Sequence, residues 1–312
     1  MTSIAKKLGI ISILTVLSAC NDGLNHDQSD QARLDGLEVS VTDFTGQLVS
    51  LAKPAERVIA LAPSAVENLY TAGAGDKLVG VMSFSDYPPE VKTLPIIGSF
   101  DKLNVERIIA LNPDLIIAWQ TGNSQAAVDQ LLELGFPVYM DQPKSLEDVA
   151  KSIRDFGMLT GQEKFADESA TKYLDSLKDI SSANADKEKV SVFYQVWHSP
   201  LQTISGDHVI NHAIEICGGN NIYADEFAIA PIVGIESILD RNPRVILGSN
   251  SRDLDLDSWQ LEWRQWQSID AVQHNHLFTI NPDHIQRHTT RLILGIESIC
   301  TSLDLARSIT KE

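Results

Sequence analysis

Large aromatic side chains follow several expected strands, at positions where a ligand could stack on them. Tyr87 follows one strand, Trp119 follows the next, and Trp197 begins a loop in the second half of the chain. Tyr and Trp rings offer wide, rigid surfaces at a small entropic cost, which suits a large, partly apolar ligand. A single aromatic at a strand end is more often a packing residue. Three at corresponding loop positions favour a binding surface.

Five of the histidines in the second half of the chain are candidate ligands, because imidazole is a common ligand of iron and of haem. They are His198, His208, His212, His284 and His288. None lies in a compact spacing such as His-Glu-x-x-His, so the simpler interpretation is that they are surface or capping residues. The sequence also has no G-x-S-x-G elbow, no P-loop and no G-x-G-x-x-G after a strand. We therefore expect a binding protein with no resident cofactor, rather than an enzyme.

Strand and helix signals alternate along the chain around these residues. This alternation is typical of a mostly parallel sheet with helices on its faces, in which ligands sit outside the carboxyl ends of the strands. The expected strands cover residues 57–61, 78–82, 115–118, 138–140, 190–196, 245–247 and 277–280, and the expected helices begin near Pro63, Val105, Ala126, Val209, Ile235 and Leu292.

One segment occurs twice. Residues 105–117 align without a gap with residues 235–247, and each copy has an acidic helix start, a short apolar-periodic helix, an Asn-Pro stop and a buried strand. Because proline cannot continue a helix, both helices stop at the same place. We infer two similar α/β lobes, and a cleft between lobes is a usual place for a small molecule to bind.

Two helices are expected between the lobes. Residues 145–148 resemble a capping box with Asp in place of Glu, and they begin a helix that runs to Gly157. A second helix, from Gln162 to Ile180, is roughly 30 Å long at 1.5 Å per residue and can hold two lobes together. The predicted divisions are an N-terminal lobe at 37–143, connecting helices at 144–186 and a C-terminal lobe at 187–312.

The first residues read as an export signal. Lys6 and Lys7 precede an apolar run that is too short to cross a bilayer and has the length of a signal-peptide core. The sequence Leu-Ser-Ala-Cys at 17–20 resembles a bacterial lipobox, so residues 1–19 would be removed and Cys20 lipidated. The alternative is an ordinary secreted protein, although Leu17 fits its cleavage rule poorly. Residues 20–36 are polar and read as a flexible tether.

The formal net charge is −17 at pH 7, and loss of the two leader lysines makes the mature chain more negative. Such a chain repels phosphate backbones, so we expect no nucleic-acid partner.

Two cysteines remain once Cys20 is assigned to the lipid. Cys217 and Cys300 belong to a chain exported to an oxidising compartment, so we expect them to form a disulfide. A loop of that size is worth on the order of 4 kcal/mol in the chain-entropy model. Two free buried thiols are the alternative.

Several blocks resemble the helical-backbone substrate-binding proteins of cobalamin, haem and ferric-siderophore importers, and most closely those for cobalamin. The similarity runs from about Arg57 to Cys300 and is carried by RVIALAPS at 57–64, SDYPP at 85–89, VERI at 105–108, NPDLIIAW at 112–119 and ICGGNNI at 216–222. It implies an α/β fold of two Rossmann-like lobes with mostly parallel sheets, joined by a single long helix. It also implies capture of cobalamin or a related corrinoid between the lobes, for delivery to an ABC permease dimer with its ATPase subunits.

The resemblance implies a set of ligand contacts. Tyr87 and Trp119 would lie against the corrin, with Phe100 where the family often has a tryptophan. Trp197 and Asp283 would close the site from the second lobe.

The resemblance also assigns residues outside the cleft. Glu106 and Glu236 match glutamates that form salt bridges with arginines on the two permease subunits, although the helix dipole alone would favour a glutamate at a helix start. Cys217 and Cys300 match the family's disulfide in the second lobe.

Two departures from the family pattern bear on the ligand. Ala230 precedes Pro231 where the family has a tryptophan before the proline, and the second-lobe histidines are not required by the match. Haem, a ferric siderophore or another metal chelate is therefore the alternative ligand. In either case we expect an exported, periplasmic monomer that is held to a membrane through Cys20.

Overall fold

The computed structural model describes residues 38–99, 102–249 and 256–309, and from Glu38 onward these residues belong to one structural unit. The predicted signal peptide, the tether, Cys20 and Phe100 lie outside the described residues. Among the residues described, none of the helices combines the length and the apolar character needed to cross a bilayer.

The first lobe is built on four parallel strands in the order β4-β3-β7-β8. Alternate side chains of these strands enter two separate hydrophobic clusters, so helices cover both faces of the sheet. One cluster lies beneath α2 and α5 (Asp148–Thr160), and the other lies beneath α3 and α4. The elements are β3 (Val58–Ala60), α2 (Pro63–Thr71), η1 (Gly75–Lys77), β4 (Leu78–Val81), η2 (Pro89–Thr93), α3 (Val105–Leu111), β7 (Leu115–Trp119), α4 (Gln125–Glu133) and β8 (Val138–Asp141).

The second lobe repeats this plan with four parallel strands in the order β12-β9-β13-β14. Helices α7 and α12 cover one face, and α8, α9 and α10 contribute to the cluster on the other. The elements are β9 (Val190–Gln195), α7 (Val209–Ile216), β12 (Gly219–Asn221), α8 (Ile235–Arg241), β13 (Val245–Gly248), α9 (Leu256–Arg264), α10 (Asp270–Gln273), β14 (Leu277–Thr279), α11 (Pro282–Ile285) and α12 (Leu292–Ile309).

Within the described ranges, three small antiparallel hairpins accompany the two sheets. The hairpin after residue 38 has its turn around Gly46, whereas the strands of the other two have only two residues each. Their strands are β1 (Val39–Thr42), β2 (Leu48–Leu51), β5 (Gly98–Ser99), β6 (Lys102–Leu103), β10 (Trp197–His198) and β11 (Leu201–Gln202).

The sequence repeat corresponds to a structural repeat. Helices α3 and α8 each span seven residues, and each ends at an asparagine with a left-handed backbone, Asn112 at φ 45° and Asn242 at φ 37°. Asparagine adopts this conformation more readily than other non-glycine residues, and the proline that follows prevents the helix from continuing. The strands that follow, β7 and β13, hold the same place in their sheets. The prediction of two similar α/β lobes is confirmed.

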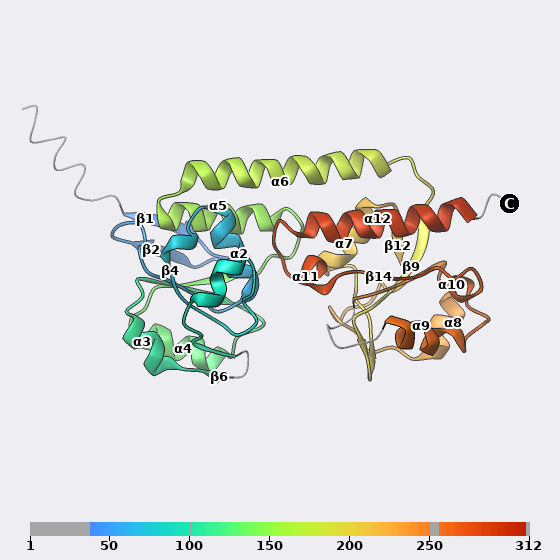
Figure 1. The fold of residues 1–312 in the computed structure, drawn as a ribbon, viewed down its shortest axis with the longest axis horizontal. Helices are drawn as coiled ribbons and strands as arrows, with labels where there is room; N and C mark the ends of the chain where they lie inside the picture. Colours follow the sequence, from blue (N-terminus) through green and yellow to red (C-terminus); the bar gives the residue numbers. More distant parts are fainter. Residues whose placement is uncertain (1–37, 100–101, 250–255, 310–312) are drawn as a thin grey trace, which may run out of the picture. The chain divides into compact units, whose positions relative to one another are not determined.

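Two long helices connect the sheets. Helix α5 (Asp148–Thr160) begins with the predicted reciprocal capping bonds: Asp148 N–H donates to Ser145 Oγ, and Ser145 N–H donates to Asp148 Oδ2. Helix α6 (Glu163–Asn184) has 22 residues and is therefore about 33 Å long. Figure 1 shows α6 passing over both lobes, beside α5 at one end and α12 at the other. The expected fold of two lobes joined by a long helix is confirmed.

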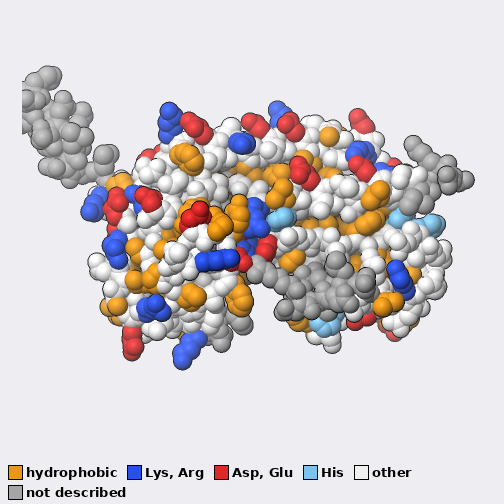
Figure 2. Space-filling view, in the orientation of Figure 1, with side chains coloured by type: hydrophobic (Ala, Val, Ile, Leu, Met, Phe, Trp, Pro, Cys, Tyr) orange, Lys and Arg blue, Asp and Glu red, His pale blue; other side chains and the backbone are white. Residues whose placement is uncertain are grey.

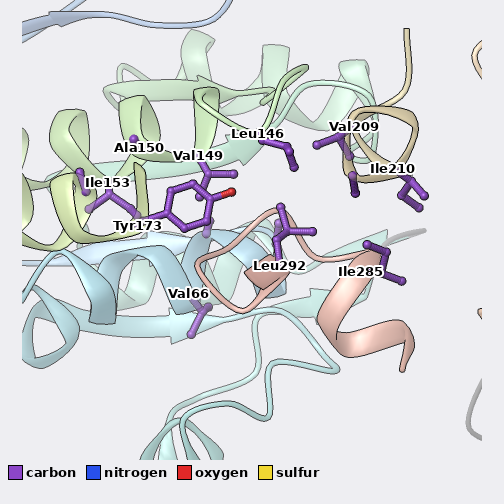
Figure 3. Packing of buried hydrophobic residues seen from close by; sticks show 14 of the residues in the cluster. Val66, Leu146, Val149, Ala150, Ile153, Tyr173, Val209, Ile210, Ile285 and Leu292 are labelled. Atoms are coloured by element: carbon purple, nitrogen blue, oxygen red, sulfur yellow. The ribbon is translucent and has the colours of Figure 1, made fainter. Parts of the chain in front are cut away.

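The lobes also pack directly against each other. One hydrophobic cluster includes Val66 of α2, Tyr173 of α6, Val209 of α7 and Leu292 of α12. Figure 3 shows these side chains in one region, with Leu146 and Ile285. Separation of the lobes would expose these apolar side chains to water, which is unfavourable. The cluster therefore opposes free hinge motion.

The two cysteines of the second lobe form the expected disulfide. The sulfur atoms of Cys217 and Cys300 are 2.00 Å apart, and the bond ties the end of α7 to the middle of α12.

Candidate functional site

A cleft of about 1130 Å³ lies between the lobes. It is lined by residues that follow the carboxyl ends of β3, β7 and β8 in the first lobe and of β9 and β13 in the second. Parallel sheets with helices on their faces place ligands at these ends. Two of the three aromatic loops that the sequence singled out, those of Trp119 and Trp197, therefore meet at one site, which also includes the start of α7 and residues 286–288 before α12.

Trp119 presents a ring to the cleft from the first lobe. Its side chain is 39% exposed and its backbone N–H donates to Asn123 Oδ1, while Asn123 Nδ2 donates to the Leu61 carbonyl. A side chain at Gly122 would meet the indole, because an added Cβ would lie 1.8 Å from Cε3. The loop is thus held to β3, and only glycine at 122 leaves room for this ring position.

Trp197 presents a second indole from the other lobe. It lies on the β10–β11 hairpin, is 47% exposed, and donates from Nε1 to the Ser199 carbonyl at 3.1 Å. The His198 ring lies 5.2 Å from it between centroids. The cleft therefore has an exposed tryptophan on each side, which suits a ligand with two extended faces.

The second-lobe wall also carries three of the five histidines, His208, His212 and His288. Burial lowers the pKa of His208 to about 4, and the nearby His212 contributes to the shift. Burial likewise lowers the pKa of His288 to about 4, with His208 as a further cause. Both rings are therefore neutral at physiological pH. Among the described residues, no group of three or more His, Cys, Asp or Glu is arranged to hold a metal ion.

The first-lobe wall contains a buried carboxyl that the sequence reasoning missed. Asp141 ends β8, lines the cleft and accepts a hydrogen bond from Ser152 Oγ at 2.6 Å. Burial raises its pKa to about 7, although the hydrogen bond from Ser152 opposes the shift. Its position directly after a predicted buried strand was the available signal.

A charged network joins the lobes beside the cleft. Glu67 of α2 is buried and accepts hydrogen bonds from Arg287 at 2.8 Å and from Arg291 at 3.0 Å. Arg287 also bonds to Asp86 and forms an ion pair with Asp283 at 3.1 Å. Figure 2 shows basic and acidic side chains gathered between the lobes, with a histidine beside them. Glu67 lies inside a helix, where nothing in the sequence marks it as the partner of two distant arginines.

The structure separates the expected ligand contacts into two sets. Trp119 and Trp197 line the cleft, whereas Tyr87 and Asp283 belong to the network next to it. The Tyr87 ring is 46% exposed and the guanidinium of Arg291 lies 4.2 Å from its centroid. The ligand roles of these four residues stay predictions.

The expected docking residues lie away from the cleft. Glu106 and Glu236 are exposed in the first turns of α3 and α8, as the repeat predicts. Neither carboxylate takes part in an ion pair within the described part of the chain.

Comparisons with known proteins agree with this architecture. The family model described as "Periplasmic binding protein" matches residues 58–284. A vitamin B12-binding protein of Vibrio cholerae serotype O1 is 35% identical over 265 residues, which cover 85% of this chain and 95% of the relative.

Solved structures give the same result. The periplasmic vitamin B12-binding protein BtuF of Vibrio cholerae has a TM-score of 0.74 at 35% identity, over 81% of this chain and 98% of that one. A possible iron-binding periplasmic solute-binding protein from Staphylococcus epidermidis has a TM-score of 0.72 at 26% identity, over 80% and 99%.

The matches extend over both lobes and the connecting helices, so they do not depend on one motif. They confirm the resemblance inferred from the sequence and the expectation of a binding protein rather than an enzyme. The chain belongs to the periplasmic binding protein family.

Proposed function

We propose that this protein is the substrate-binding component of an ABC importer and that it captures cobalamin or a related corrinoid between its lobes. The observation that carries the proposal is the large cleft with one exposed tryptophan on each side, Trp119 and Trp197. Its volume of about 1130 Å³ is slightly above the usual range for small-molecule sites, which suits a large macrocycle. The vitamin B12-binding relatives support the same ligand class.

Haem or a ferric siderophore is the second candidate. The observation that favours it is the presence of three histidines on the cleft wall, since neutral imidazole binds iron.

Isothermal titration of the mature protein with cyanocobalamin, haem and a ferric siderophore tests the proposal. We expect tight binding of cyanocobalamin, and weaker binding in Trp119→Ala and Trp197→Ala. A matched control is Phe165→Ala, which removes an exposed ring of α6 outside the cleft and should leave affinity unchanged. Binding of haem alone, with no heat from the corrinoid, would overturn the proposal in favour of the second candidate.

Delivery to the permease is the other half of the proposed function. Glu106 and Glu236 are exposed at matching positions of the two lobes, so each could meet an arginine on one subunit of a permease dimer. A binding protein that engages a dimer through its own two lobes works as a monomer. The acidic character of the chain is compatible with such pairing.

Membrane attachment through Cys20 completes the proposal, with residues 1–19 as the signal peptide and 20–36 as the tether. Cys20→Ser should move the protein from the membrane fraction to the soluble periplasmic fraction. Loss of incorporated labelled fatty acid should accompany the change. A membrane-bound Cys20→Ser variant would argue against the anchor.

The proposed divisions after the tether are 37–143, 144–186 and 187–312. Limited proteolysis followed by mass spectrometry tests them, because cleavage should begin near the two boundaries rather than inside either sheet.

A further inference from the structure

The histidines of the second-lobe wall are not equivalent. One ring nitrogen of His208 is already in use, because Nδ1 accepts a hydrogen bond from Ile210 N–H at 3.1 Å. The neutral ring therefore carries its proton on Nε2 and offers the cleft a donor but no lone pair. His212 lies one turn further along α7. His208 is thus suited to hydrogen bonding rather than to metal coordination.

His288 is held in place from the first lobe. Its backbone carbonyl accepts a hydrogen bond from Asn68 Nδ2 at 2.9 Å. The residues on either side, Arg287 and Thr289, both bond to the carboxylate of Glu67. The backbone at His288 is therefore fixed by three contacts across the lobe interface, and a ring on a fixed backbone pays little entropy on binding.

The ring of His288 is free to act on a ligand. It lines the cleft, and within the described part of the chain neither ring nitrogen has a hydrogen-bond partner. Neither nitrogen is among the buried unpaired polar atoms of the described residues, so neither is fully shielded in this half-buried side chain. Burial lowers the pKa of His288 to about 4, and the neutral ring keeps one lone pair at physiological pH.

We propose that His288 supplies an axial imidazole nitrogen to the metal of a bound metal macrocycle whose axial position is exchangeable. This rests on the proposed function, and it names the corrinoid form that the cleft would prefer. A macrocycle brings its own equatorial donors, so one imidazole is sufficient. This agrees with the finding that the described histidines do not form a chelating group of their own.

The step is a ligand exchange. In aquocobalamin the imidazole lone pair forms a bond to cobalt(III), and the bound water leaves as water. No electron is transferred, and because the ring is already neutral no proton is released. In cyanocobalamin the axial cyanide is held strongly and does not exchange under the same conditions.

The test compares these two corrinoids on the mature protein at mildly acidic pH, where the cobalt of aquocobalamin carries water. We expect the visible absorption bands of aquocobalamin to shift on binding, as they do when free imidazole is added. Cyanocobalamin should bind without a shift. We expect aquocobalamin to bind about tenfold more tightly than cyanocobalamin, and His288→Ala to bring the two affinities within about twofold.

The matched control is His212→Ala, the same change on the same wall, which should keep the shift. An unchanged melting temperature in His288→Ala shows that the fold is intact, and His288→Gln provides a second variant of similar size. Aquocobalamin bound without a spectral shift, or a shift that survives in His288→Ala, would overturn this inference and leave the proposed function standing. Failure of both corrinoids to bind would overturn the proposed function and this inference with it.

Discussion

The two lobes have the same sheet order but present different chemistry to the cleft. The first-lobe wall carries Trp119 and the carboxyl of Asp141, whereas the second carries Trp197 and three histidines. On the outer surface, in contrast, the two lobes carry the same chemistry, because Glu106 and Glu236 occupy equivalent positions. The two lobes are thus alike at the surface where we propose that a symmetric permease dimer binds. They differ at the cleft, where the proposed ligand has two different faces.

Removal of the disulfide should give the largest difference in stability between the lobes, because the first lobe contains no cysteine. The double change Cys217→Ala with Cys300→Ala should lower the free energy of unfolding by about 4 kcal/mol in the chain-entropy model. Chemical denaturation measures this. Amide exchange should show lost protection in β9 and β13 and little change in β3 and β7. Equal losses in both sheets would show that the lobes unfold as one cooperative unit.

Breaking the charged network measures how much the contacts between the lobes contribute to the stability of the protein. Glu67→Ala should cost about 3 kcal/mol, because it leaves Arg287 and Arg291 partly unpaired in a buried setting. Thermal and chemical denaturation report the change. Glu168→Ala, which breaks the exposed pair with Lys164 on α6, is the control and should cost at most about 1 kcal/mol. Similar costs for the two variants would mean that the network is only peripheral.

Tyr87 and Trp119, the two described aromatic residues of the first lobe that we expect to contact the ligand, should differ in their effect on binding. Trp119→Ala should weaken corrinoid affinity by about thirtyfold, or about 2 kcal/mol, with little change in the melting temperature of the free protein. A packing ring would instead leave a cavity worth about 3–5 kcal/mol. Tyr87→Ala should weaken binding less, because the Tyr87 ring already faces Arg291. Calorimetric titration and melting curves together decide between these roles.

The two walls should respond to pH in opposite directions. Asp141 has a pKa raised to about 7, so the stability from its neutral form is present below about pH 4 and is lost as pH rises towards 7. His208 and His288 have pKa values lowered to about 4, so their contribution is present above about pH 6.5 and is lost as pH falls.

Asp141→Asn should therefore stabilise the protein by at least about 1 kcal/mol at pH 7 and above, and should flatten the decline between pH 4 and 7. Denaturation across this pH range measures the effect. The control is Glu133→Gln, an exposed residue of α4 whose change should leave the profile unaltered. An Asn variant that follows the parent curve would mean that Asp141 stays ionised.

Substitution of Glu106 or Glu236 should have the smallest effect per residue, and it should leave the affinity for the ligand unchanged. Glu106→Ala and Glu236→Ala should each weaken permease binding by about fivefold, which is about 1 kcal/mol, and the double change should be worse. Charge reversal to Lys should impair uptake further. Glu163→Ala, an exposed glutamate in the first turn of α6, is the control. Normal uptake by a doubly reversed variant would reduce both glutamates to helix-dipole partners.

The sequence alone determined most of the fold, because its signals are local. Helix stops at Asn112 and Asn242, the capping box at Ser145 and the alternation of buried strands with helices are fixed by neighbours in the chain. The repeat then implied two lobes, and the strand ends pointed to Trp119 and Trp197, which do line the cleft. Helix α9 was missed, since its tryptophans Trp259 and Trp263 are buried against Gln195, a partner far away in the sequence.

The tertiary structure decided which of the remaining side chains meet. Glu67 and Arg287 are more than two hundred residues apart, yet they share a buried ion pair that holds His288 at the edge of the cleft. Tyr87 was expected as a ligand contact from its loop and Asp283 from the family resemblance. The same network holds both beside the cleft, and their ligand roles stay predictions. Burial sets the charge of Asp141 and His288, and burial depends on how the two lobes pack. The periodicity of apolar residues in the sequence shows which face of a helix or strand is buried. It does not show which distant side chains pack against that face, because the folded chain brings them there.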